Sequence, residues 1–202
     1  MNEPLHTAPQ PSPPPEEPAL TNGQALRQDL YLWLQTMVFA LSILILLFTF
    51  VGRVVGVDGS SMEPTLHDGD LLLLQSLGYT PKQGDVVVLT KPFGHVTGAI
   101  VKRVIAVGGQ QVEIDYDAGT VSVDGAVLDE PYIKEAMQEP PAATFETITS
   151  LTVPEGHIFV MGDNRNNSDD SRDTRLGTVD TRYVLGRAVA VVLPIGHFGP
   201  IQ

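Results

Sequence analysis

The sequence predicts a mainly β protein, in which antiparallel sheets follow a single N-terminal transmembrane helix. Three observations lead to this fold class. Residues 30–52 form one apolar run without a charged side chain. Residues 53–202 contain short runs rich in Val, Ile and Leu that are separated by turn signals, as in sheet proteins. No window in that part has the periodicity of an amphipathic helix.

The composition excludes several classes of function. The 202 residues include 24 Asp and Glu against 12 Lys and Arg, for a formal net charge of −12. A nucleic-acid partner is not expected, because binding a phosphate backbone requires clustered basic side chains. The chain has no cysteine, which excludes disulfide bonds, a cysteine nucleophile and cysteine-ligated metal centres.

Residues 1–29 are expected to form a disordered, proline-rich tail. Seven of the 16 prolines fall within residues 1–22, and proline lacks the amide hydrogen that helices and sheets need. Such a segment can also be a ligand for a proline-binding domain, but nothing else in the sequence supports that role.

Residues 30–52 predict a single membrane-spanning helix. A helix of this length rises about 34 Å and can cross a hydrocarbon core of about 30 Å. Tyr31 and Trp33 lie at its start, where interfacial aromatic residues are expected. A buried core helix would need apolar partners on every face, and a cleavable signal peptide has a shorter apolar region with more positive charge before it. The flanking charges, Arg27 and Arg53, do not determine the orientation.

The remainder, residues 53–202, is expected to form one antiparallel β domain. The pair Asp124-Gly125 between two apolar runs is typical of a hairpin with a type I′ turn, because that turn needs positive φ at both central residues. The expected strands are Leu71–Leu74, Asp85–Thr90, Ala99–Val107, Val112–Asp115, Thr120–Val123, Ala126–Leu128, Thr147–Val153, His157–Met161 and Tyr183–Leu193.

A serine-containing loop follows the apolar run directly. The segment Gly59-Ser60-Ser61-Met62-Glu63-Pro64 combines small side chains with a proline, which favours a tight turn. Such a turn can present a hydroxyl and backbone amides to a substrate carbonyl. By itself the pattern is weak, because most serine-rich turns are only turns.

Lys102 lies in an otherwise apolar run. Because side chains alternate along a strand, it is expected to share a face with Ile100, Val104 and Ala106. Burial disfavours the charged form of a lysine and lowers its pKa, so that it can act as a base near neutral pH. In one alternative Lys102 is exposed and Arg103 points inward, and in another both are exposed at a sheet edge. The local sequence does not decide among these possibilities.

A polar segment, residues 161–172, follows an apolar strand directly. It is dense in side chains that form hydrogen bonds and is expected to build a network that positions other groups. An EF-hand calcium loop is excluded, since Arg165 and Thr174 occupy positions where the pattern requires an oxygen ligand and a glycine.

Together these segments resemble bacterial type I signal peptidases, which are membrane-anchored serine proteases of the Ser–Lys dyad type. The resemblance covers about three quarters of the chain, from the apolar run to near the C-terminus. It rests on four segments in the family order, namely 59–66 (GSSMEPTL), 84–88 (GDVVV), 101–109 (VKRVIAVGG) and 162–172 (GDNRNNSDDSR).

The resemblance implies the reacting groups. Ser61 resembles the nucleophile, and Lys102 resembles the general base that later protonates the leaving amine. Backbone groups of Gly59, Ser60 and Ser61 are implied to form the oxyanion hole. Some family members have a serine hydroxyl where this chain has Gly59, so backbone donors alone are expected here.

The resemblance also implies supporting residues. Ser168 resembles the residue that orients the lysine. Asp170 and Arg172 resemble a supporting ion pair behind the site. Met62 and Val101, which flank the dyad in sequence, are expected to line a small pocket for the substrate residue before the scissile bond.

The implied function is removal of signal peptides from exported preproteins after small residues of the Ala-x-Ala type, through an acyl-enzyme. The implied protein is a monomer in the cell membrane. Its N-terminus is cytoplasmic and its β-rich peptidase domain, residues 53–202, is extracytoplasmic. Its partners are preprotein signal peptides and, through the anchor, membrane lipid. No cofactor and no metal ion are expected.

Three other interpretations remain open. The first is a catalytically inactive, membrane-anchored binding module of the same fold. The second is a self-cleaving, repressor-like protease, against which the membrane span and the lack of a DNA-binding domain argue. The third is a Ser–His–Asp triad that uses His67, His95 or His157, although no motif connects a histidine to Ser61.

Overall fold

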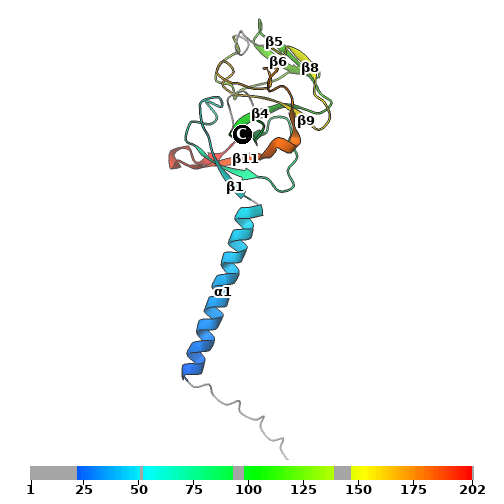
Figure 1. Ribbon diagram of the computed structural model, residues 1–202. Helices are drawn as coiled ribbons and strands as arrows, with labels where there is room; N and C mark the ends of the chain where they lie inside the picture. Colours follow the sequence, from blue (N-terminus) through cyan, green and yellow to red (C-terminus); the bar gives the residue numbers. More distant parts are fainter. Residues whose placement is uncertain (1–21, 51, 93–97, 139–146, 202) are drawn as a thin grey trace, which may run out of the picture. The chain divides into compact units, whose positions relative to one another are not determined.

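The structure is a computed structural model that describes residues 22–50, 52–92, 98–138 and 147–201. The chain divides into two units, Met1–Leu44 and Ile45–Gln202. The first contains most of the single α-helix and the second contains all of the strands (Figure 1). The prediction of a mainly antiparallel β protein with one N-terminal apolar helix is confirmed.

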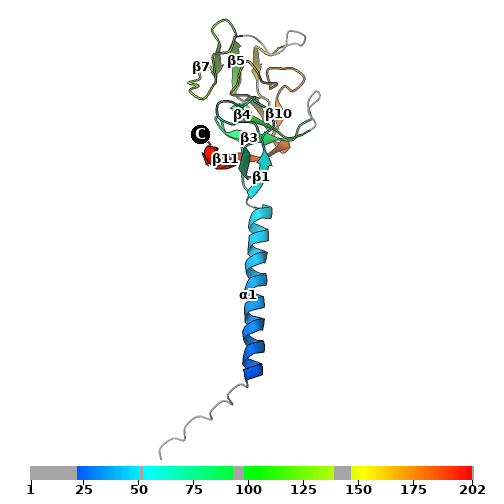
Figure 2. The same cartoon turned by 90° about the vertical axis from the view of Figure 1, so that its left-hand side faces the viewer.

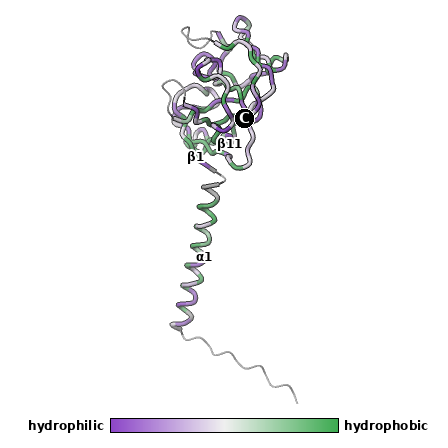
Figure 3. The backbone as a smooth tube through the Cα atoms, turned by 45° about the vertical axis from the view of Figure 1, so that its right-hand side comes forward, coloured by the Kyte–Doolittle hydropathy of each residue, from purple (hydrophilic) through white to green (hydrophobic). Residues whose placement is uncertain are grey.

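The helix α1 spans Asn22–Phe50. Its stretch Leu26–Leu46 is long and apolar enough to cross a membrane, with a mean hydropathy of 1.8. None of this stretch is buried against the rest of the protein. Hydrophobic residues predominate in its C-terminal half (Figure 3). These properties of length and composition agree with the predicted anchor.

The bounds of α1 differ from the expected ones at both ends. Residues 22–29, expected to belong to the tail, are helical, because no proline lies between Pro18 and Pro64 and the residues after Gly23 are mostly good helix formers. Gly52, expected at the end of the anchor, is the first residue of a strand, since glycine is a poor helix residue. The proline-rich residues 1–21 lie outside the described residues.

The larger sheet has eight strands, all of them paired in antiparallel fashion. Its path runs β1-β2-β11-β3-β4-β9-β10, and β12 pairs with β11 outside this path. Strand β4 therefore lies inside the sheet, between β3 and β9. The bounds are β1 Gly52–Gly56, β2 Leu71–Gln75, β3 Val86–Leu89, β4 Ile100–Val107, β9 His157–Met161, β10 Val179–Asp180, β11 Val184–Leu193 and β12 Gly199–Pro200.

The smaller sheet has four strands in the order β7-β6-β5-β8. It lies at one end of the β unit, and β1 and β11 lie toward the other end (Figures 1 and 2). Asp124 and Gly125 have φ values of 52° and 78°, the positive values that the predicted β6–β7 turn requires. The bounds are β5 Gln111–Asp115, β6 Thr120–Val123, β7 Ala126–Val127 and β8 Ser150–Thr152.

Three strands were not expected from the sequence, namely β1, β10 and β12. Strands β10 and β12 have two residues each, which is too short for a period-two pattern to be recognised. Strand β1 has glycine at both ends, and its pairing with β2 decides its conformation. Two short 3₁₀ helices, η1 Thr181–Tyr183 and η2 Ile195–His197, complete the domain.

A bulge in β4 corrects the expected face of Lys102. The pairing of β4 with β9 shifts between Val104 and Ala106, so the alternation of side chains is interrupted there. Ile100 and Val104 pack in one buried cluster with Val87, the cross-strand partner of Lys102, as expected. Ala106 packs instead in a second cluster, between the two sheets.

Candidate active site

Ser61 and Lys102 meet although 41 residues separate them in sequence. Lys102 Nζ lies 2.6 Å from Ser61 Oγ, a hydrogen-bonding distance. Ser61 belongs to the loop between β1 and β2, and Lys102 belongs to β4 in the interior of the larger sheet. The sheet thus brings together the two residues that sequence analysis singled out as nucleophile and base.

Burial dominates the electrostatics of Lys102. The residue is only 4% exposed, and removal from water lowers the pKa of its amine below the ordinary value of 10.5. The carboxylates of Asp170 and Asp169 act in the opposite direction without reversing the shift. Both alternatives are wrong about Lys102, because its side chain is buried. Arg103 is buried as well, as only the first of them expected.

Two asparagines hold the serine loop, and sequence analysis assigned neither a role. The Asn164 backbone N–H donates to the Ser61 carbonyl over 3.0 Å, and its Nδ2 donates to the Ser60 carbonyl over 3.1 Å. Asn167 Nδ2 donates to Ser60 Oγ over 2.9 Å. These contacts fix the loop against the polar segment 161–172, which was expected to position other groups.

The backbone donors near Ser61 differ in their availability. The Gly59 N–H is already used, since it donates to Asp68 Oδ1 over 2.8 Å. Gly59 also has a φ of +92°, a conformation that favours glycine. Among the described residues, the Ser61 N–H has no acceptor within hydrogen-bonding distance. Of the three residues expected to form the oxyanion hole, Ser61 therefore offers an unused donor and Gly59 does not.

Asp170 and Arg172 form a fully buried ion pair, and its supporting role in the site stays a prediction. Arg172 Nε and Nη2 donate to the two oxygens of Asp170 over 2.8 and 2.9 Å. Burial, the largest single influence, acts to raise the pKa of Asp170, but the Arg172 guanidinium together with the Gly162 N–H and the charge of Lys102 holds the pKa below its usual range. The Gly162 N–H also donates to Asp170, over 3.0 Å. The pair thereby anchors the backbone at the end of β9.

A second buried ion pair was missed by sequence analysis. Arg103 Nε and Nη2 donate to Asp163 over 2.9 and 2.7 Å, and Thr65 Oγ1 donates to the same carboxylate over 2.5 Å. The Arg103 guanidinium lies 4.0 Å from the centre of the Tyr132 ring. Asp163 thus joins β4, the serine loop and the polar segment. The signal was the Lys102-Arg103 pair itself, since a strand interior with two adjacent cations needs a carboxylate nearby.

Ser168 is close to the site but makes no hydrogen bond that would orient Lys102. Its Oγ is buried and has no partner among the described residues. A methyl group added at Gly162 would lie 2.3 Å from that Oγ and 2.4 Å from the Ser61 carbonyl oxygen. Gly162 therefore allows Ser168 and the Ser61 backbone to approach each other. The orienting role of Ser168 stays a prediction.

Met62 and Val101 lie mainly in the core. They are 1% and 7% exposed and pack in a buried cluster with residues of β2 and β3. Their expected part in a substrate pocket stays a prediction. In the sequence they directly follow Ser61 and precede Lys102.

The described histidines do not contact Ser61. His67 donates its backbone N–H to Asp70 and its ring lies beside His197, whereas the His157 ring contacts the Glu155 carbonyl. His95 lies outside the described residues. Among the described residues, the side-chain partner of the Ser61 hydroxyl is Lys102, so this geometry does not support the triad.

We expect Gly162→Ala to destabilise the protein by about 1–3 kcal/mol, because the new methyl group overpacks a buried position. Gly199→Ala is the matched control, since a methyl group there meets nothing within 4 Å and neither glycine has a positive φ. Thermal unfolding of the full-length chain in detergent, followed by circular dichroism, measures both. Equal midpoints for the two variants would show that the close approach at Gly162 has no energetic weight.

Comparisons with known proteins identify the family. The family model for signal peptidase, peptidase S26, matches residues 30–193. A signal peptidase I from Bacillus licheniformis is 34% identical over 177 residues, covering 85% of this chain and 92% of the relative. A probable signal peptidase I-1 from Synechocystis is 35% identical over 187 residues, covering 88% of each chain.

A solved structure is also similar. The crystal structure of a signal peptidase I from Enterococcus faecalis has 32% sequence identity, and the match covers 55% of this chain and 98% of that chain, with a TM-score of 0.44. The family match extends from the start of the apolar run to the end of β11 and includes both Ser61 and Lys102. The chain therefore belongs to the signal peptidase family, peptidase S26.

Proposed function

We propose that the protein is a Ser–Lys endopeptidase that removes signal peptides from exported preproteins through an acyl-enzyme. Family membership supports a signal peptidase with preprotein substrates. The observation that carries the finer proposal is the contact of 2.6 Å between the buried Lys102 amine and the Ser61 hydroxyl. An inactive binding module would not need a buried lysine, which is costly to maintain, beside this hydroxyl.

In the proposed reaction, neutral Lys102 accepts the Ser61 proton as Oγ attacks the scissile carbonyl carbon. The tetrahedral intermediate collapses to an ester on Ser61, and Lys102 gives its proton to the leaving amine. A water molecule then attacks the ester while Lys102 acts as base again, and Ser61 recovers its proton. The unused Ser61 N–H is the proposed donor to the oxyanion.

The pairing of β4 suggests where a substrate strand binds. Strand β4 pairs with β3 from Ile100 to Arg103 but with β9 only from Arg103 onward. On the side away from β3, no described strand pairs with residues 100–102. An extended signal peptide added at this edge would run toward Lys102, and backbone hydrogen bonds would align its scissile bond. Small substrate side chains, as in Ala-x-Ala, suit a site whose neighbours Met62 and Val101 are already packed.

The proposed cellular arrangement follows from the family. The apolar stretch of α1 crosses the cell membrane once, the N-terminus is cytoplasmic, and the β unit is extracytoplasmic, where translocated signal peptides emerge. The anchor confines enzyme and substrate to the same membrane, so that modest contacts suffice for binding. The proposed protein is a monomer.

We expect Ser61→Ala and Lys102→Arg to lower kcat/KM on a model preprotein by on the order of 10⁴–10⁶, because each removes a group that acts in the chemical step. Arginine keeps the charge but cannot release its proton. The matched controls are Ser150→Ala and Lys82→Arg, at exposed positions, and His157→Ala tests a histidine base. Cleavage is followed with purified protein in detergent.

Retention of activity in Ser61→Ala would contradict the assignment of the nucleophile. Loss of activity in His157→Ala without misfolding would instead favour a histidine mechanism. Circular dichroism on every variant separates loss of chemistry from loss of structure.

The pH dependence of kcat/KM tests the base. Since Lys102 must be neutral to accept a proton, activity rises with pH as the amine loses its proton, on a limb below the ordinary lysine value of 10.5. The Asp169 carboxylate raises the pKa of Lys102, so Asp169→Asn moves the limb to lower pH. Asp117→Asn, at an exposed carboxylate in the β5–β6 turn, is the control and leaves the limb in place.

If the rising limb of the kcat/KM profile stays at the same pH or moves to higher pH in Asp169→Asn, the titrating group is not Lys102. Asp169→Asn and Asp117→Asn each remove one negative charge. Any general effect of net charge on the profile is therefore the same in both and cancels in their difference.

Protease protection tests the orientation. We expect protease added to intact spheroplasts to digest the β unit, because the proposed topology exposes it outside the cytoplasm. A cytoplasmic marker protein in the same sample controls for lysis. Protection of the β unit until the spheroplasts are lysed would reverse the proposed topology.

A further inference from the structure

Asp70 differs from the other buried aspartates in its charge partner. Among the described residues, four other aspartates are buried, and an arginine pairs with each of them. Asp70 is 1% exposed, and its only ion-pair partner in the described part of the chain is the ring of His197. The four arginine pairs are Asp85–Arg187, Asp163–Arg103, Asp170–Arg172 and Asp173–Arg175.

A buried carboxylate without a permanent cation is costly to maintain. Asp70 Oδ1 lies 2.8 Å from His197 Nδ1, and Asp70 Oδ2 accepts the His67 backbone N–H over 2.8 Å. A histidine supplies a positive charge only while it is protonated, and a peptide group supplies none. The position therefore favours a cation near the carboxylate.

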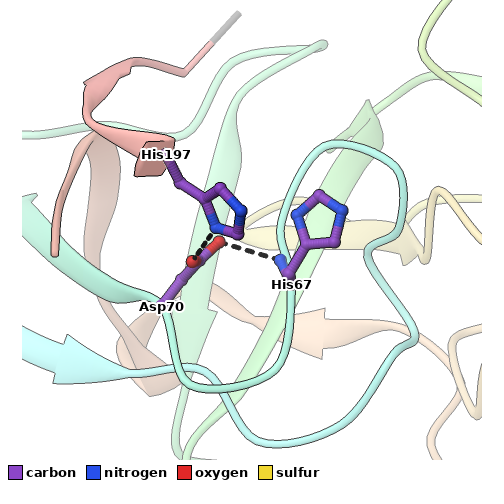
Figure 4. Close-up of side chains that lie close together, drawn as sticks. All are labelled: His67, Asp70 and His197. Atoms are coloured by element: carbon purple, nitrogen blue, oxygen red, sulfur yellow. Dashed lines mark hydrogen bonds and ion pairs between the residues drawn. The ribbon is translucent and has the colours of Figure 1, made fainter. Parts of the chain in front are cut away.

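Two imidazole rings stand beside this carboxylate. The ring centres of His67 and His197 are 4.8 Å apart, and one ligand atom from each of the three residues lies within 4.8 Å of the others. Figure 4 shows both rings next to the Asp70 carboxylate. Both histidines are exposed, so that their rings can turn toward a shared ion.

The fold holds the three residues together from two distant segments. His67 and Asp70 lie at the end of the serine loop, and Asp70 directly precedes β2, whereas His197 ends η2 after β11. Strands β2 and β11 are paired, with Leu71 opposite Leu193. This pairing fixes Asp70 close to the C-terminal segment.

We propose that His67, Asp70 and His197 form a binding site for a divalent transition cation of the Zn²⁺ class. Two imidazole nitrogens and one carboxylate oxygen are ligands that zinc prefers, with water as the fourth ligand. In a tetrahedral zinc site with bonds of about 2.0–2.2 Å, ligand atoms lie roughly 3.3 Å apart. A turn of the exposed rings brings the observed atoms to that spacing. Mg²⁺ and Ca²⁺ are not expected to bind, because they prefer oxygen ligands.

No metal ion was expected from the family resemblance, and His67 and His197, which are 130 residues apart, form no spacing motif that would indicate one. The ion in this site neutralises Asp70 and ties the end of the serine loop to the segment after β11. Its role is structural, since Ser61 Oγ has Lys102 as its partner.

The test is isothermal titration of the metal-stripped, full-length protein in detergent with ZnCl₂. We expect one saturable site, and we expect His67→Ala and His197→Ala each to weaken its Kd by at least about tenfold, as loss of a ligand does. The control is a triple variant, His6→Ala/His95→Ala/His157→Ala, which removes the other three histidines of the chain and keeps the site.

Thermal unfolding provides a second readout that is independent of activity. Zinc raises the midpoint of the wild type and of the triple variant, because a ligand that binds only the folded state stabilises it. At the same zinc concentration it raises the midpoint of His197→Ala less, because the weaker Kd gives less stabilisation, and MgCl₂ changes none of them. Absence of a saturable zinc site in the wild type, loss of the site in the triple variant, or an unchanged Kd in both single variants would overturn the proposal.

Discussion

The exclusion of water from the Lys102 amine is the constraint on which the rest of the site depends. A lysine in water keeps its proton at neutral pH and cannot act as a base. Here the strand position buries it, and burial is the largest influence on its pKa. Arg172 lowers the pKa of Lys102 to a smaller extent, and its charge is balanced by Asp170, as the charge of Arg103 is by Asp163. The amine is thus controlled by burial rather than by a neighbouring cation.

The polar segment after β9 organises the groups around this amine. Through Asn164 and Asn167 it holds the backbone and side chain of the serine loop, and through Asp163 it contacts β4. Gly162 permits the close approach of Ser168 and the serine loop. Because a buried network is most rigid when each member has its partners, the segment can set the geometry of Ser61 and Lys102 together.

The same rule of charge compensation applies at the other end of the serine loop. Asp70 lies between two histidines instead of beside an arginine, at the place where the loop enters β2. Two buried carboxylates therefore hold the second half of the loop that carries Ser61, Asp163 through Thr65 and Asp70 through the His67 backbone. The two carboxylates differ in the group that faces them. Asp163 pairs with an arginine, whereas Asp70 pairs with a histidine ring.

The amino-acid sequence by itself determined the antiparallel β fold, the apolar helix and the identity of Ser61 and Lys102 as candidates, because strand alternation, hydropathy and local motifs are short-range patterns. It did not determine the bulge after Val104, the two-residue strands or the Asp163–Arg103 pair. Those features arise when strands pair across the sheet and buried charges must find partners. The cluster of Asp70 with His197 belongs to the same class, since only the pairing of β2 with β11 brings residues 127 positions apart into contact.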